Sequence, residues 1–119
     1  LMSPKTHVRF LNSSYSHLAH HCDAEGEMFC ELDLSDATSR GIQDGDQVRV
    51  FNERGSLDVV ARVKSSGGRV RSGLVLVPFG WVGARTKDTK TVNALTNDQA
   101  ADFGGAVAFY DTMVQVEKI

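Results

Sequence analysis

Short alternations of apolar and polar residues, each ended by a turn signal, run along most of this chain. Residues 47–52 (Q-V-R-V-F-N) alternate most regularly and predict a strand with Val48 and Val50 on one face. Residues 53–55 (E-R-G) predict a tight reversal into a second strand over residues 56–63. The two strands are therefore expected to form a β-hairpin.

Further strands are predicted where short apolar runs meet turn residues. Residues 28–34 (M-F-C-E-L-D-L) alternate apolar and acidic side chains, which predicts a half-buried strand. Residues 7–11 are predicted to form a strand behind a proline that fixes its entry. Residues 74–77 are apolar on both faces and predict a deeply buried strand, and residues 106–110 together with 113–116 complete the sheet.

Two short helices are predicted between these strands. Residues 12–14 can cap a helix through residues 15–19, where apolar side chains follow at spacings of three and four. Ser35 is predicted as the N-cap of the second helix, with Asp36 in its first turn and Gly41 just past its end. With about seven short strands at the turn spacing of all-β folds, the pattern predicts a mainly β fold, a closed barrel with small helical inserts.

Length and charge narrow the class of protein. At 119 residues, the chain is expected to form one domain over residues 1–119. A net charge of −2, from 13 basic and 15 acidic residues, gives no reason to expect nucleic acid or a membrane surface as partner. The N-terminus shows no signal-peptide pattern, and Leu1 ahead of Met2 leads us to expect a piece cut from a longer protein. Two cysteines make no disulfide framework, which favours a reducing, cytoplasmic location.

Hydrogen-bonding side chains cluster at two places that are about eighty residues apart. Polar residues flank the predicted strand 7–11, and V-N-A-L-T-N-D follows at residues 92–98. The amide of Asn93 offers a donor and an acceptor together, which suits the edge of a heterocycle. Alternatively, Asn93 and Thr96 cap a short helix over residues 98–101.

Other chemistries find weaker support. His17, His20, His21, Cys22 and Cys30 are metal-ligand types, but their spacing matches no regular metal-binding pattern. The Gly55-Ser56 dipeptide is the type that self-processing pyruvoyl decarboxylases cleave in small β barrels, but Gly-Ser at a hairpin tip is far more often simply a turn. Trp81 is either a core residue or an exposed binding aromatic. The sequence contains no G-x-S-x-G, G-x-G-x-x-G or Walker motif.

Five phrases occur in an order that resembles a known family. They are P-K-T-H, F-L-N-S-S, F-C-E-L-D-L-S-D-A-x-x-R-G-I-x-D-G-D-x-V-R-V-F-N-x-R-G, V-N-A-L-T-x-D and A-F-Y-D-T-M-V-Q-V. Together they resemble the C-terminal dinucleotide-binding domain of molybdopterin oxidoreductases of the dimethyl sulfoxide reductase family. The likeness extends from residue 3 to residue 117.

The resemblance implies a double-psi β barrel whose loops hold part of a bis(molybdopterin guanine dinucleotide) cofactor with molybdenum or tungsten. It implies that Asn93 hydrogen-bonds the edge of a pterin. The other implied contacts are Lys5, Thr6 and His7 near a pterin, and Asn12, Ser13 and Ser14 at the phosphate or guanine portion. No residue of this chain is implied as a catalytic group or as a metal ligand.

The resemblance also implies that the cofactor and the domain have different roles. The cofactor carries the redox chemistry, while the domain binds and orients it and is not catalytic alone. The implied partners are the remaining domains of the same oxidoreductase and an iron–sulfur electron-transfer subunit. The alternative is a free-standing double-psi barrel that serves protein interaction and binds no cofactor.

Overall fold

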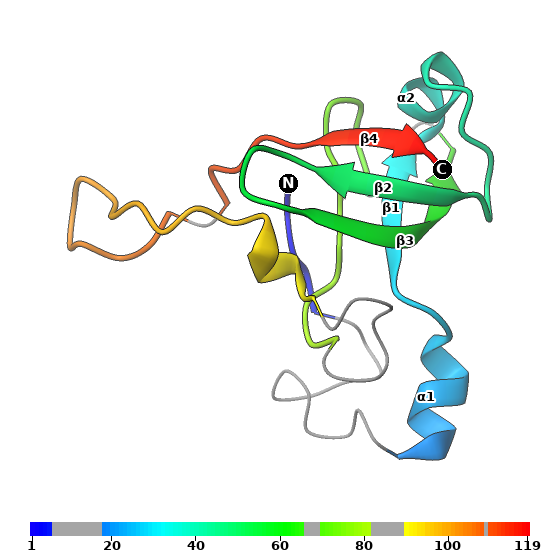
Figure 1. The fold of residues 1–119 in the computed structure, drawn as a ribbon, viewed down its shortest axis with the longest axis horizontal. Coiled ribbons are helices and arrows are strands. Elements are labelled where there is room, and N and C mark those ends of the chain that lie inside the picture. Colours follow the sequence, from blue (N-terminus) through cyan, green and yellow to red (C-terminus); the bar gives the residue numbers. More distant parts are fainter. Residues whose placement is uncertain (6–17, 66–69, 82–89, 109) are drawn as a thin grey trace.

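The computed structural model describes residues 1–5, 18–65, 70–81, 90–108 and 110–119. Its centre is a four-stranded mixed sheet in the order β1-β3-β2-β4 (Figure 1). The elements along the chain are α1 (Ala19–Glu25), β1 (Phe29–Asp33), α2 (Leu34–Ser39), β2 (Gln47–Phe51), β3 (Ser56–Lys64), the 3-10 turn η2 (Val92–Ala94) and β4 (Gln115–Lys118). The prediction of a mainly β fold is confirmed. Within the described ranges, no helix has the length and apolar content needed to cross a membrane.

The predicted β2–β3 hairpin is confirmed, and it forms the middle of the sheet. Its strands pair antiparallel, with Val50 opposite Leu57. β1 pairs parallel to β3, with Cys30 opposite Ala61, and α2 lies in the crossover between β1 and β2. β4 adds antiparallel to β2, so that Val50 also faces Val116. The last strand of the chain therefore lies beside the hairpin (Figure 1).

Residues near the N-terminus extend this sheet beyond β1. Leu76 exchanges backbone hydrogen bonds of 2.8 and 3.1 Å with Glu31, at the edge of β1. Met2 donates to Val75 O at 2.9 Å and accepts from Val77 N at 3.0 Å. The predicted strand over residues 74–77 is therefore present as isolated bridges and not as a regular strand. The segments around Met2 and Leu76 lie side by side on the outer edge of β1.

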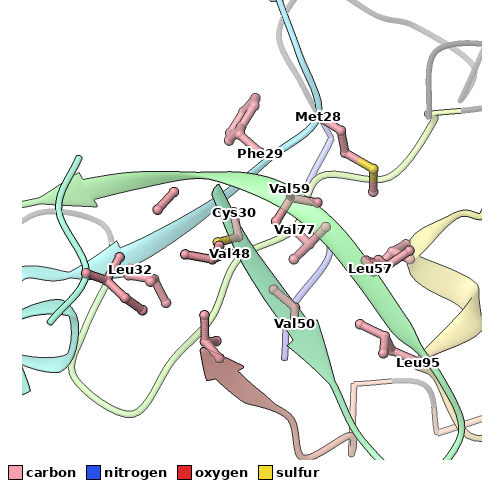
Figure 2. Packing of buried hydrophobic residues seen from close by; sticks show 14 of the residues in the cluster. Met28, Phe29, Cys30, Leu32, Val48, Val50, Leu57, Val59, Val77 and Leu95 are labelled. Carbon is pink, nitrogen blue, oxygen red and sulfur yellow. The ribbon is translucent and has the colours of Figure 1, made fainter. Parts of the chain in front are cut away.

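Alternate side chains of the hairpin face a single hydrophobic core. Val48 and Val50 of β2 are fully buried, and Leu57 and Val59 of β3 are 3% and 2% exposed (Figure 2). The predicted inner face of residues 47–52 is thus confirmed. Trp81 is only 1% exposed, so that it is a core residue and not an exposed binding aromatic.

The prediction that β1 is half-buried is wrong, because all five of its residues are buried. One reason is that β1 is paired on both edges, to β3 and to Leu76. The acidic side chains are buried with the strand: Glu31 is 4% and Asp33 3% exposed. On the same face, the guanidinium of Arg62 stacks 3.4 Å from the centroid of the Phe29 ring.

The two helices are described to different extents. α1 extends over Ala19–Glu25, and residues 15–17 of the helix predicted over residues 15–19 lie outside the described residues. Gly26, at φ 73°, follows α1 as a left-handed turn residue. The N-cap of α2 is Asp33 and not Ser35, because the Asp33 carboxylate accepts a 2.9 Å hydrogen bond from Ser35 N.

The C-terminal part of the sheet also differs from its prediction. Residues 106–108 form no regular strand, because Gly104 and Gly105 adopt positive φ and fold the segment onto itself, with Ala101 N donating to Ala106 O at 2.7 Å. β4 begins only at Gln115. The segment that precedes it projects away from the sheet (Figure 1). Four strands make up the sheet in the described ranges, and the predicted strand over residues 7–11 lies outside them.

Candidate functional site

The turn that carries Asn93 is anchored in the core. Thr91 caps η2, because its hydroxyl accepts from Asn93 N at 3.3 Å. Val92, the first residue of η2, and Leu95, which follows the turn, are 3% and 0% exposed. Asn93 itself is exposed, and its carbonyl accepts from Thr96 Oγ1 at 3.2 Å. The arrangement holds the backbone through local contacts and leaves the Asn93 amide at the surface.

The alternative interpretation of Asn93 and Thr96 as helix caps is wrong. Residues 98–101 are not helical. Instead, the side chain of Asn97 accepts from Gln99 N at 3.2 Å and donates to Asp111 O at 2.8 Å. The capping residue of this region is Thr91, on the other side of Asn93.

The tip of the β2–β3 hairpin packs against this turn. Asn52 Nδ2 donates to the carbonyl oxygens of Leu95 at 2.8 Å and Met113 at 3.2 Å. Asn52 Oδ1 accepts from Arg54 N at 2.9 Å and Gly55 N at 3.2 Å. One side chain therefore shapes the hairpin turn and binds it to two distant segments. The sequence indicates a turn at residues 53–55, but no pattern in it points to these distant contacts.

Few of the predicted cofactor contacts can be placed. Lys5 is exposed and follows Pro4, whose carbonyl accepts from Phe79 N at 3.3 Å. In the view of Figure 1, η2 and the end of residues 1–5 are drawn at the end of the sheet where β1 begins. The remaining predicted contacts lie outside the described residues: Thr6, His7, Asn12, Ser13 and Ser14.

The described residues hold no metal cluster. In these ranges, no group of three His, Cys, Asp or Glu side chains is close enough to bind a metal ion. Cys30 lies in the core, and burial raises the pKa of its thiol to about 12. A thiol with that pKa is protonated at neutral pH and is a poor ligand. Cys30 is therefore a structural residue of the core.

A second polar contact, which the sequence did not reveal, holds the loop before Leu74. The Asp36 carboxylate accepts from Ser72 Oγ at 2.7 Å and from Gly73 N at 2.6 Å. These two hydrogen bonds lower the pKa of Asp36. Asp36 was expected in the first turn of α2, where the structure has it, but its partners lie 36 and 37 residues further along the chain.

Comparison with known proteins identifies the domain. The family model described as "Molydopterin dinucleotide binding domain" matches residues 1–113. The chain belongs to this family. The predicted resemblance is thereby confirmed, and the cofactor that the family implies is a molybdopterin guanine dinucleotide with molybdenum or tungsten.

Individual relatives are oxidoreductases of much greater length. The chain is 35% identical over 116 residues to "Probable oxidoreductase YoaE" of Bacillus subtilis, a match that covers 98% of this chain and 16% of that protein. It is 33% identical over 88 residues to "Dimethyl sulfoxide reductase DmsA" of Escherichia coli, covering 71% of this chain and 10% of that protein. The molybdopterin dinucleotide-binding domain thus spans a small fraction of each relative.

A solved structure shares the fold. "Acetylene Hydratase from Pelobacter acetylenicus" superposes with a TM-score of 0.77 over 100% of this chain and 18% of the other, at 18% sequence identity. At that identity the likeness concerns the fold alone.

Proposed function

We propose that this chain is the C-terminal domain of a molybdenum- or tungsten-dependent oxidoreductase and holds part of a bis(molybdopterin guanine dinucleotide) cofactor. Family membership supports the cofactor class. The observation that carries the proposal to a named residue is the exposed amide of Asn93, held on a turn whose flanking side chains are buried. Recognition of a heterocycle edge requires an accessible side-chain amide on a backbone that is held in a fixed position.

The chemistry of the described donors fits the cofactor. The Asn93 side chain can donate to and accept from a pterin edge at the same time, and the exposed Lys5 ammonium can donate hydrogen bonds near a pterin. Neither side chain offers a thiolate or carboxylate, which agrees with contact to the organic part and not to the metal. We assign Thr6 and His7 to the pterin as well, and Asn12, Ser13 and Ser14 to the phosphate or guanine portion.

These residues bind and orient the cofactor, and we assign none of them a role in the chemical reaction. The bound cofactor supplies the redox chemistry of its metal. Asn93 fixes the pterin edge through paired hydrogen bonds, and Lys5 donates hydrogen bonds near the pterin. The domain alone is therefore not catalytic. The activity of the whole protein depends on domains outside this chain.

A closed double-psi barrel is the architecture we propose for the domain. The residues around Met2 and Leu76 continue the sheet past β1. On their other side, Tyr110 Oη donates to Ser3 O at 3.5 Å, and Tyr110 lies in the segment that leads into β4. The opposite edge of the sheet is β4 itself. Contacts from the first residues therefore reach toward the last strand, which supports closure.

The partners we propose are the remaining domains of the same oxidoreductase and an iron–sulfur electron-transfer subunit, in the cytoplasm. The length of the relatives supports the first, since this chain matches only 16% of YoaE and 10% of DmsA. A free-standing barrel for protein interaction is the alternative. It predicts that the complete natural protein is purified without pterin, molybdenum or tungsten.

The test uses Asn93→Ala and His7→Ala in the complete natural protein. We expect both variants to lose bound pterin and metal, measured by fluorescence of the oxidised pterin and by mass spectrometry of the metal, while circular dichroism stays that of the parent. Asn97→Ala is the matched control, because its amide is engaged with Asp111 O and is not offered to a ligand. Unchanged pterin and metal in both variants would show the two assignments to be wrong.

A further inference from the structure

We propose that Asn52 is a positioning residue for the cofactor site: it holds the Asn93 turn at the place where the pterin edge is recognised. This inference rests on the proposed function of Asn93. It adds a residue that would not touch the cofactor and that belongs to a different element, the β2–β3 hairpin.

The hydrogen-bonding capacity of the Asn52 side chain is fully used. An asparagine amide has two donor hydrogens and an oxygen that accepts two hydrogen bonds. Here the donors go to Leu95 O and Met113 O, and the oxygen accepts from Arg54 N and Gly55 N. Nothing remains with which to bind a ligand. A rotation that exchanged the amide oxygen and nitrogen would face donors to donors and acceptors to acceptors, so that the orientation is fixed.

A second contact joins the same two segments. A Cβ atom at Gly55 would lie 2.8 Å from Ala94 O, which is closer than real Cβ contacts allow. The hairpin backbone thus lies directly on the turn, and Asn52 binds the next carbonyl, that of Leu95. These carbonyls belong to the two residues that follow Asn93.

The consequence for Asn93 is that its backbone has little room to move. The backbone N–H of Asn93 donates to the Thr91 hydroxyl, and the two residues after Asn93 contact the hairpin. The 3-10 turn is only three residues long and is too short to keep its position by itself. The hairpin tip therefore helps to set the position of Asn93, together with the buried side chains of Val92 and Leu95.

Asn52→Asp is the variant that separates the two functions of this side chain. Aspartate keeps two acceptor oxygens for Arg54 N and Gly55 N, so that the hairpin turn is preserved. It loses both donors and places a negative carboxylate against the carbonyls of Leu95 and Met113, which repels them. The tether to the turn is broken while the turn of the hairpin remains.

The experiment compares Asn52→Asp, Asn93→Ala and the double variant in the complete natural protein. Amide hydrogen exchange at Ala94 and Leu95 is expected to accelerate roughly tenfold in Asn52→Asp, as for loss of one net hydrogen bond, with hairpin amides still protected. Bound pterin is expected to fall as far as in Asn93→Ala, and the double variant to lose no more. Asn97→Asp, the same chemical change at an asparagine further along the chain, is the control and should retain its pterin.

The outcomes separate the inference from the proposed function. Loss of pterin in Asn93→Ala, with normal exchange and normal pterin in Asn52→Asp, overturns the positioning of Asn93 by Asn52 and leaves the binding proposal standing. Full pterin in Asn93→Ala overturns the binding role and this inference with it. If Asn52→Asp fails to fold, Gly55→Ala tests the inference instead, because it displaces Ala94 and deletes no side-chain hydrogen bond. A lowered content of bound pterin in Gly55→Ala supports the inference, and an unchanged content overturns it.

Discussion

Gly55 and Ala94 are in direct backbone contact, with no room for a side chain between them. Gly55 does not adopt the positive φ found at seven other described glycines, so space and not backbone conformation requires glycine here. We predict that Gly55→Ala lowers the free energy of unfolding by about 1–3 kcal/mol, the usual cost of overpacking. Urea denaturation followed by circular dichroism measures the change.

Gly41→Asn provides the matched comparison. Gly41 has φ 65°, and a Cβ atom at this position would meet no neighbouring atom within 4 Å, so its requirement is conformational. Asparagine adopts this left-handed conformation more readily than other side chains, and we expect a loss below about 1 kcal/mol. An equal loss of unfolding free energy in Gly55→Ala and Gly41→Asn would contradict the view that Gly55 is required by space and Gly41 by backbone conformation.

The contact of Asp36 with Ser72 and Gly73 predicts a pH-dependent stability. The hydrogen bonds from Ser72 and then Gly73 lower the pKa of Asp36 from its ordinary 3.8. Its contribution is complete above pH 3.8 and is lost as the pH falls through the lower folded-state pKa. Asp36→Asn should therefore be less stable than the parent at neutral pH, by about 1 kcal/mol or less at this solvated site, and the difference should shrink in acid.

Urea denaturation of the parent and of Asp36→Asn over a pH series measures the difference in their stability. Asp23→Asn, at an exposed position of α1, controls for the loss of one negative charge. A difference between the parent and Asp36→Asn that stays constant down to about pH 2 would contradict the linkage to Asp36.

Cys30 should be unreactive in the folded protein. Its side chain is fully buried, and burial raises its pKa to about 12, so that almost no thiolate is present at about pH 8. We expect no labelling of Cys30 by iodoacetamide in native buffer and complete labelling in urea, measured by mass spectrometry in a Cys22→Ser background. Rapid native labelling of Cys30 would show that β1 is more accessible than the structure has it.

Two leucines near the end of β1 test the core. Leu32 is 2% exposed and Leu34 is 50% exposed, although both were predicted in one alternating strand. We predict that Leu32→Ala lowers the free energy of unfolding by about 2–5 kcal/mol, while Leu34→Ala changes it by less than about 0.5 kcal/mol. Thermal unfolding of the two variants gives the comparison. Similar losses would contradict the observed end of β1.

Local patterns predicted what local contacts determine. The hairpin around Gly55, the inward faces of Val48 and Val50 and the glycine after α2 follow from residues close together in sequence. The burial of Glu31 could not be predicted in this way, because it depends on Leu76, which pairs with β1 from 45 residues away. A charged residue in an alternating pattern indicates an exposed face only if nothing covers that face.

The candidate site shows the same division. Asn93 was proposed from its chemistry and from the resemblance of V-N-A-L-T to a family motif. Asn52 could not be proposed in this way, since its decisive partners Leu95 and Met113 are 43 and 61 residues away. The preference of asparagine for turns explains why Asn52 Oδ1 accepts from Arg54 N and Gly55 N. The hydrogen bonds that Asn52 Nδ2 donates to distant carbonyls are revealed only by the fold.

The pairing of β2 with β3 has a consequence for the order of folding. The hairpin closes over a short stretch of chain, whereas β1–β3 pairing and the arrival of Leu95 require long loops to close. We expect the hairpin to form early and to carry Asn52 already oriented by its own turn. The segments at Leu95 and Met113 then dock onto a hairpin that has already formed, so that the last part of the chain to fold is the part that completes the proposed cofactor site.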